Sequence, residues 1–254
     1  MPAYPLSENT YTVDSSKVFI PFQRGIDDIR NRPGSLLVDI VPFLVQTKEY
    51  NIVIDPGLGL KLSNGHYHIL DNLMRHQLSA SDIDIILLSH LHKDHLAGAV
   101  MEIADAMSPM FPNAIYYVQE GELIDALSKS SSSYDRKVID YLLQEGLLRT
   151  INGNTTLKDC IQCEISGGHT PYHQIFIIDD GNANFFYGGD VLPQPQQLIR
   201  RFVAKYDYDG KHSADKRIEY GKRIAEGDLT ALYFHSALQP MSKVSYDGDK
   251  FMVI

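Results

Sequence analysis

The chain has 254 residues, of which 44% are hydrophobic and 22% are charged, and its formal net charge is −9. These fractions are ordinary for a globular protein, and the length suits one α/β domain. An acidic surface repels phosphate backbones, so we expect no nucleic-acid partner. The first residues lack the basic and apolar regions of a secretion leader, and no apolar run is long enough to span a bilayer. We therefore expect a cytoplasmic protein without a membrane partner.

The first third of the chain predicts strands and then a helix. Residues 35–46 and 51–55 are rich in apolar and β-branched side chains, and they form a predicted strand pair. Asp55-Pro56-Gly57 ends this pair sharply. Pro42 interrupts the first strand and indicates a bulge or an edge strand there. Residues 68–78 predict a helix.

The most informative stretch is Ser89-His90-Leu91-His92-Lys93-Asp94-His95, which follows a strongly apolar run at 83–88. That run predicts a strand buried on both faces. In an extended segment His90 and His92 point the same way, whereas Asp94 and His95 follow after the chain bends. This arrangement suits two adjacent metal centres, and imidazole with carboxylate is a ligand set of zinc, iron or manganese. The alternative, Asp94 as a helix N-cap beside loop histidines, explains only one of the four residues.

The middle of the chain predicts mainly helices after this loop. A helix is expected from Leu96 to about Met107, a strand at 114–118, and helices at 120–127 and 135–147. The serine-rich segment 128–134 between the last two is either a lid over the active site or a plain solvent loop.

The last third predicts mostly strands. Two apolar runs flank Asp179-Asp180-Gly181-Asn182 and predict a β-hairpin, and residues 244–254 predict a second one. A helix is expected at 214–226 and a strand at 230–234. Cys160 and Cys163 fall in an alternating segment and are interpreted as core or half-buried thiols. His212 is interpreted as a solvated loop histidine.

The pattern His-x-His-x-Asp-His after an apolar strand resembles the signature of the metallo-β-lactamase superfamily of hydrolases. Four further segments match the pattern of that family in order: Asp55 after an early strand, Gly168-His169-Thr170-Pro171, Asp190 after a strand, and His235 at a late strand end. The resemblance covers roughly residues 35–236. It implies an α/β fold, an αββα sandwich of two mixed β-sheets with helices on both outer faces, in a single domain over 1–254.

The resemblance also implies two divalent metal ions, with zinc expected first and iron or manganese as alternatives. The implied ligands are His90, His92 and His169 for one ion, Asp94, His95 and His235 for the other, and Asp190 bridging both. Asp94 and Asp190 would serve in catalysis, while Asp55 and His173 would lie behind the ligands. A hydroxide shared by two such ions attacks a carbonyl carbon or a phosphorus atom.

The implied function is a metal-dependent hydrolase of lactones or other ester-type bonds, with phosphotriesters included. True β-lactamases carry Cys or Ser where Asp190 stands, which disfavours antibiotic hydrolysis. Homoserine-lactone lactonases carry a Tyr three residues later, where this chain has Pro193. The missing phenol could come from Tyr172, Tyr187, Tyr206 or Tyr208. The segment 201–209 resembles the lactonase and organophosphate-hydrolase branch.

Three alternatives stay open. A thioesterase resembling glyoxalase II would normally carry a helical C-terminal domain, for which little chain remains after His235. An iron-dependent oxidoreductase of the same fold is the second, although the diiron reductases replace His92 by Glu. The third is a metal-binding or regulatory protein that has lost turnover. The expected partner is a small-molecule substrate, with a homodimer as an open possibility.

Overall fold

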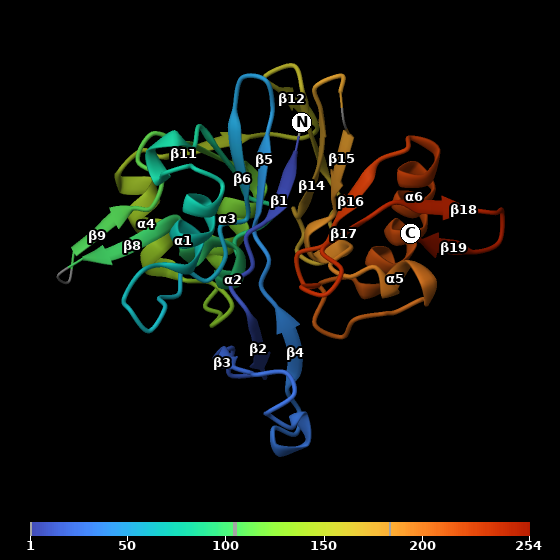
Figure 1. Ribbon diagram of the computed structural model, residues 1–254, viewed down its shortest axis with the longest axis horizontal. Helices are drawn as coiled ribbons and strands as arrows, with labels where there is room; N and C mark the ends of the chain where they lie inside the picture. The colour runs from blue at the N-terminus through green and yellow to red at the C-terminus, as the bar shows by residue number, and fades with distance from the viewer. Residues whose placement is uncertain (1, 104–105, 183) are drawn as a thin grey trace.

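The computed structural model describes residues 2–103, 106–182 and 184–254, and two six-stranded mixed sheets form its centre (Figure 1). The first sheet has the order β1 (Ala3–Pro5), β5 (Phe43–Gln46), β6 (Asn51–Ile54), β7 (Ile85–Leu87), β10 (Ile115–Gln119) and β11 (Leu148–Ile151). The second has the order β12 (Thr155–Leu157), β13 (Ile161–Ile165), β14 (Gln174–Asp179), β15 (Asn184–Tyr187), β16 (Thr230–Leu232) and β17 (Met241–Ser242).

The two sheets face each other across a largely apolar layer, which a buried hydrogen bond between Gln119 and Gln174 also crosses. Phe43, Ile54 and Leu87 of the first sheet belong to the same buried cluster as Phe176 and Tyr187 of the second. Because successive side chains of a strand point to opposite faces, the alternate residues of β5, β6 and β7 enter a second core on the outer side. Burial on both faces explains why these strands are continuous apolar runs in the sequence.

Helices cover the outer face of each sheet (Figure 1). The outer core of the first sheet includes residues of α1 (His68–Arg75), α3 (Glu120–Ser128) and α4 (Arg136–Gln144). The second sheet packs against α5 (Gln196–Ile199) and α6 (Gly210–Glu226). The predicted αββα sandwich is therefore confirmed. Within the described residues, no helix has both the length and the apolar character needed to cross a membrane.

The predicted strand over 35–46 is two strands that belong to different sheets. β4 (Leu36–Asp39) pairs with β2 (Thr10–Val13), whereas β5 pairs with β1 and β6. Pro42 lies between them, where its missing N–H interrupts the ladder. β2 also pairs with β3 (Ile20–Pro21), and these three strands project from the body of the molecule (Figure 1).

The predicted helix from Leu96 to Met107 is wrong. α2 (Lys93–Leu96) is a single turn that continues into the 3-10 turn Ala97–Ala99, and β8 (Val100–Ile103) then pairs with β9 (Ala106–Pro109). Gly98 donates its N–H to the Gly57 carbonyl and touches the Pro56 carbonyl so closely that no side chain would fit. Packing against this neighbouring loop overrides a weak helical pattern. Residues 104–105 of the predicted helix lie outside the described residues.

The two predicted hairpins are confirmed. β14 pairs antiparallel with β15, and β18 (Val244–Tyr246) pairs antiparallel with β19 (Phe251–Val253). Further 3-10 turns lie at Ile29–Asn31, Ala80–Asp82 and Gly189–Val191. Cys163 is buried, Cys160 is half-buried, and both are free thiols, as predicted.

Glu8 carries a fully buried carboxyl group beside the loop that follows β6, and this group accepts a 2.6 Å hydrogen bond from the Leu58 N–H. Burial is the main reason that its pKa rises from 4.5 to about 8. The pKa of Glu8 is therefore higher in the folded protein than in the unfolded chain. This group therefore stabilises the fold fully below the unfolded pKa, and that contribution is lost as pH rises through about 8.

We therefore expect Glu8→Gln, which cannot titrate, to remove this pH dependence. Between about pH 5 and about pH 8, the unfolding free energy of the variant relative to the wild type should rise by about 3 kcal/mol. Denaturant unfolding at both pH values measures this difference. An unchanged difference would contradict the raised pKa of Glu8.

Candidate metal centre

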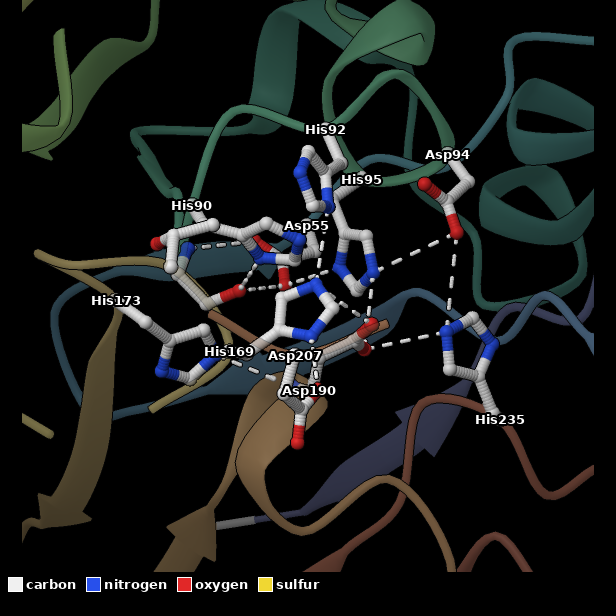
Figure 2. Close-up of polar contacts among 12 residues, drawn as sticks. Asp55, His90, His92, Asp94, His95, His169, His173, Asp190, Asp207 and His235 are labelled. Atoms are coloured by element: carbon white, nitrogen blue, oxygen red, sulfur yellow. Dashed lines mark hydrogen bonds and ion pairs between the residues drawn. The ribbon is translucent and has the colours of Figure 1, made fainter. Parts of the chain in front are cut away.

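Loops that follow strand ends bring the histidines and aspartates of five sequence segments together at one end of the sheets (Figure 2). β6 and β7 are parallel, so Asp55 and His90, which follow them, lie at the same edge of the first sheet. β15 and β16 are also parallel, and Asp190 and His235 follow their carboxyl ends. His169 lies on the loop between β13 and β14. Parallel pairing thus explains how residues so distant in sequence converge.

The first candidate ligand group is His90, His92 and His169, whose possible ligand atoms all lie within 4.8 Å of one another. His92 Nδ1 and His169 Nε2 are 3.0 Å apart. Burial, and after it the neighbouring imidazoles, holds the pKa of both His90 and His92 well below the usual value. Both rings are therefore neutral and keep a lone pair, which is the form that binds a metal.

The second candidate ligand group is Asp94, His95 and His235, whose possible ligand atoms also lie within 4.8 Å of one another. His95 Nε2 and His235 Nε2 each lie 3.7 Å from Asp94 Oδ2. Burial by itself would lower the pKa of His95, but Asp190, Asp94 and Asp55 outweigh it and raise this pKa well above the usual value. A concentration of negative charge therefore surrounds this group, and such charge attracts a cation.

Asp190 lies between the two groups and contacts both (Figure 2). Its Oδ1 is 3.1 Å from His95 Nε2 and 3.1 Å from His235 Nε2, and its Oδ2 is 3.3 Å from His169 Nε2. Burial alone would raise the pKa of this carboxyl, but His235, His95 and His169 hold it well below its usual range. The carboxylate is therefore charged and available to both groups at once.

His173 holds the backbone of Asp190 in place. The His173 ring is fully buried, and its Nδ1 lies 2.6 Å from Ser166 Oγ. Its Nε2 accepts a 3.1 Å hydrogen bond from the Asp190 N–H. Gly189 has φ +48° and packs against the His173 ring, where a side chain would clash. His173 therefore lies behind the ligand groups and does not belong to either one.

Hydrogen-bond acceptors behind three of the histidines determine which ring nitrogen faces the centre. A carboxylate or carbonyl oxygen can only accept, so the facing Nδ1 carries a hydrogen and Nε2 is the nitrogen turned toward the centre. The pairs are His95 Nδ1 with Asp55 Oδ2 at 2.8 Å, His169 Nδ1 with Asp207 Oδ1 at 2.8 Å, and His235 Nδ1 with the Asp39 carbonyl at 2.6 Å. His92 differs, because its Nδ1 is the atom directed at the first group.

Asp55 is fully buried and has φ +46°, a left-handed conformation that aspartate tolerates better than most residues. It accepts hydrogen bonds from Ser89 N (2.7 Å), Ser89 Oγ (2.5 Å), His95 Nδ1 (2.8 Å) and Tyr187 OH (2.6 Å). Asp55, His90 and His95 also have ligand atoms within 4.8 Å of one another. The acceptor sites of Asp55 are nevertheless occupied, so this residue orients His95 and the start of the ligand loop.

The residues at the centre fit divalent metal ions. His90 Nε2, His95 Nε2 and Asp190 Oδ1 are buried and, among the described residues, have no hydrogen-bond partner of good geometry. Buried polar atoms are almost always satisfied, and a cation would satisfy all three. Neutral imidazoles and carboxylates are also the donors that zinc and related metals prefer.

Sequence reasoning missed three acidic residues that support this centre. Asp207 and Asp39 hold His169 and His235, and nothing in their local sequence indicates these long-range contacts. Glu122 on α3 is fully buried; it accepts from Leu91 N (3.1 Å) and from Thr170 Oγ1 (2.6 Å). A carboxylate on the apolar face of a predicted helix is a signal that could have identified it.

Glu122 joins the two loops that carry the first ligand group, so we expect Glu122→Ala to weaken metal binding. Removing a support behind metal ligands lowers affinity by roughly 10- to 100-fold. Competition with a chromophoric chelator measures this affinity. Glu120→Ala, an exposed neighbour on the same helix, is the matched control. Equal affinities in the two variants would contradict the role of Glu122.

A pocket of about 280 Å³ opens in front of the centre. Its wall is apolar on the side of the projecting strands, and phenols and lysines complete it. Lining residues include Val13, Phe19, Leu36 and Val38, then Tyr134, Tyr206 and Tyr208, and then Lys17, Lys93 and Lys129. His92, Asp94, His169, Asp190 and His235 also face this space. The centre is therefore accessible to a small molecule.

The structure shows which of the four tyrosines considered as a source of the phenol lie at the pocket. Tyr206 and Tyr208 line the pocket. Tyr187 is buried and donates its hydroxyl hydrogen to Asp55, and the Tyr172 ring packs over Gly121. Tyr134, which the sequence did not suggest, also lines the pocket, with its ring centroid 5.0 Å from that of His92.

The serine-rich segment is attached to the ligand loop by its backbone. The Lys93 N–H donates a 2.8 Å hydrogen bond to the Ser133 carbonyl, and His92 forms an isolated β-bridge with Tyr134. Ser131 and Ser133 line the pocket. The segment therefore forms part of the pocket wall.

His212 is solvent-exposed, as predicted, but it belongs to a helix and not to a loop. His212 lies in the first turn of α6, which begins at Gly210, four residues before the predicted start. Its Nε2 is 2.8 Å from the Ser166 carbonyl, so it donates a hydrogen bond to the end of the β13 segment. The Asp209 carboxylate accepts from the His212 N–H and caps the helix.

A two-sheet sandwich with imidazoles and carboxylates gathered at one end defines a class of α/β proteins that bind divalent metals. Residues 38–243 match the family model of the metallo-beta-lactamase superfamily. The chain belongs to this superfamily of metal-dependent hydrolases, as the resemblance predicted.

A curated relative agrees with this assignment. The chain is 26% identical over 214 residues to ribonuclease Z of Saccharolobus solfataricus, an alignment that covers 82% of this chain and 62% of the relative. It therefore spans about 62% of the length of that curated relative.

Solved structures share the whole fold. A probable metal-dependent hydrolase from Staphylococcus aureus superposes with a TM-score of 0.79 at 23% identity, covering 100% of this chain and 96% of the other. AidC, a dizinc quorum-quenching lactonase, superposes with a TM-score of 0.74 at 20% identity, covering 99% of this chain and 93% of the other. The hydrolase AbOPH of the beta lactamase superfamily gives 0.76 at 21% identity, again covering 99% and 93%.

Proposed function

We propose that this chain is a dinuclear metal-dependent hydrolase that cleaves a lactone or another ester-type bond, with phosphotriesters as related substrates. The observation that carries the proposal is the position of Asp190, whose two oxygens face separate ligand groups. A single ion would need only one of these groups. Two groups that share a charged carboxylate support a pair of ions.

In this proposal His90, His92 and His169 would hold one ion and Asp94, His95 and His235 would hold the other, with Asp190 placed between the two groups. Zinc is the expected metal, with iron or manganese as alternatives. A pair of divalent ions supplies Lewis acidity and lowers the pKa of water enough to make it a nucleophile near neutral pH.

The protein itself contributes orientation and proton donors. Asp55, Asp207 and the Asp39 carbonyl fix the imidazoles, so little reorganisation is needed during the reaction. Burial, and after it Asp190 and Asp207, raises the pKa of Tyr206 above its usual value. Burial likewise raises the pKa of Tyr134. Both phenols therefore stay protonated near neutral pH, and either can donate a hydrogen bond to the substrate oxygen or the leaving group.

The pocket favours a small substrate over a polymer. Its volume of about 280 Å³ suits a compact ester, whereas the net charge of −9 opposes binding along a nucleic-acid backbone. AidC is a dizinc lactonase, which adds support for the ester class. The relationship to ribonuclease Z favours hydrolysis in general, without carrying its substrate to this shorter chain.

A substrate panel with defined metals tests the proposal. The zinc-loaded protein should hydrolyse lactones and aryl esters, and chelation should abolish this activity until metal is restored. Thioesters and β-lactams should be poor substrates. A coloured iron protein without activity on any ester, lactone or phosphotriester would instead favour the iron-dependent oxidoreductase alternative.

A further inference from the structure

Positive side chains surround the pocket of a chain whose net charge is −9. Lys17, Lys93 and Lys129 line the pocket, whereas its acidic lining residues are Asp94, Asp190 and Asp207. Asp94 and Asp190 face the metal centre, and Asp207 is fully buried against His169. The part of the pocket away from the centre is therefore positively charged.

Two of these lysines are half-buried without a carboxylate partner. Lys17 and Lys93 form no ion pair with any residue of the described chain, whereas Lys129 pairs with Asp125 at 2.5 Å. A partly desolvated ammonium group without a counter-charge carries a free-energy cost that a bound anion would offset. The absence of an ion pair at Lys17 and Lys93 therefore indicates a site where an anion can bind.

Both lysines lie beside the apolar part of the pocket wall. Lys17 occupies the turn between β2 and β3, with φ +57°. Lys93 follows His92, and its Nζ lies 5.8 Å from the ring centroid of Phe19 on the same turn. Val13, Leu36 and Phe19 provide apolar surface in the same pocket. A ligand that fits this side needs an apolar portion and a negative charge together.

We propose that the substrate of this site carries an anionic substituent on its apolar portion, and that Lys17 and Lys93 bind this substituent. The inference rests on the proposed hydrolase function and narrows its substrate class to esters or lactones that bear a carboxylate or phosphate group. The two lysines would act on substrate selection, because a charge remote from the reacting bond contributes mainly to binding and encounter.

Three aryl esters, in which the same three methylene groups separate the ester carbonyl from the end group, test this inference with the zinc-loaded full chain. Their 4-nitrophenyl acyl groups end in a methyl group (pentanoate), a carboxylate (glutarate monoester) or a phosphate monoester (4-phosphonooxybutanoate). The readout is the ratio of kcat/KM for each anionic ester to that for the neutral ester. Partial loss of metal lowers all three rates alike, so the ratio isolates recognition of the charge.

The wild type should prefer at least one anionic ester, and the better one identifies the anion. Lys17→Met and Lys93→Met should each reduce the ratio by about fivefold, the upper range for single ion pairs near a surface. Added salt should reduce it as well. Lys137→Met, an exposed substitution on α4 outside the pocket, is the matched control and should keep the wild-type ratio.

A wild-type ratio at or below one, or a ratio that both pocket variants retain, would overturn the assignment of Lys17 and Lys93 while leaving the hydrolase proposal in place. Failure of the zinc-loaded protein to hydrolyse any of the three esters, or any lactone, would overturn the hydrolase proposal together with the inference that rests on it.

Discussion

Asp190→Asn should reduce hydrolysis by roughly 10³-fold or more, the scale expected when a group that stabilises developing charge is removed. The asparagine side chain keeps the shape of Asp190 but loses the negative charge that faces both ligand groups. Asp190→Ala and His92→Ala should have equally large effects. Steady-state kinetics with excess metal measures the loss, and far-UV circular dichroism checks that the fold is retained.

Asp249→Asn provides a matched control, because it removes the same charge from an exposed turn between β18 and β19. This variant should keep wild-type activity. Full activity of Asp190→Asn with excess metal would contradict the proposed role of this carboxylate.

Asp55→Ala should lower the unfolding free energy by about 3–5 kcal/mol. The substitution leaves the Ser89 N–H, the Ser89 hydroxyl, His95 Nδ1 and the Tyr187 hydroxyl buried without their shared acceptor. Because His95 then loses its orienting partner, metal affinity should also fall by roughly 10- to 100-fold. Denaturant unfolding of the metal-free protein isolates the first effect, and chelator competition measures the second.

Asp55→Asn separates lost acceptors from backbone strain. Asparagine adopts the left-handed conformation of residue 55 readily, so any destabilisation of this variant comes from the weakened hydrogen bonds. A stability of Asp55→Ala within about 1 kcal/mol of the wild type would show that these hydrogen bonds contribute little.

The sequence was sufficient to predict strands that are buried on both faces and turns that depend only on local residues. β5, β6 and β7 are buried on both faces, so their apolar runs identify them without knowledge of the partner strands. The same property places Asp55 and His90 at one sheet edge, because both follow such strands. The hairpin around Asp179–Asn182 could also be predicted, because its turn depends only on the residues within it.

Errors arose where a distant segment decides the local conformation. The helix predicted after His95 ends early because Gly98 packs on the Pro56–Gly57 loop. The strand over 35–46 divides at Pro42 because its halves pair with different neighbours. His212 is exposed as predicted, but its placement in a loop was wrong, and its hydrogen bond to the Ser166 carbonyl, 46 residues away, could not be predicted.

The supporting residues of the centre were the least predictable part. Asp207, Asp39 and Glu122 contact ligand histidines or their loops from 31 to 196 residues away. No spacing rule links such pairs, because only the closure of the two sheets brings them together. Ligand residues are recognisable by type and local spacing, whereas the residues that orient them depend on the tertiary fold.

The most direct test of two ions held around Asp190 is anomalous X-ray scattering at the zinc edge from crystals of the zinc-loaded protein. We predict two peaks in each chain, one beside the imidazoles of His90, His92 and His169 and one beside Asp94, His95 and His235, with Asp190 reaching both. A single peak at full occupancy, or two peaks of which Asp190 contacts neither, would contradict the proposed dinuclear centre.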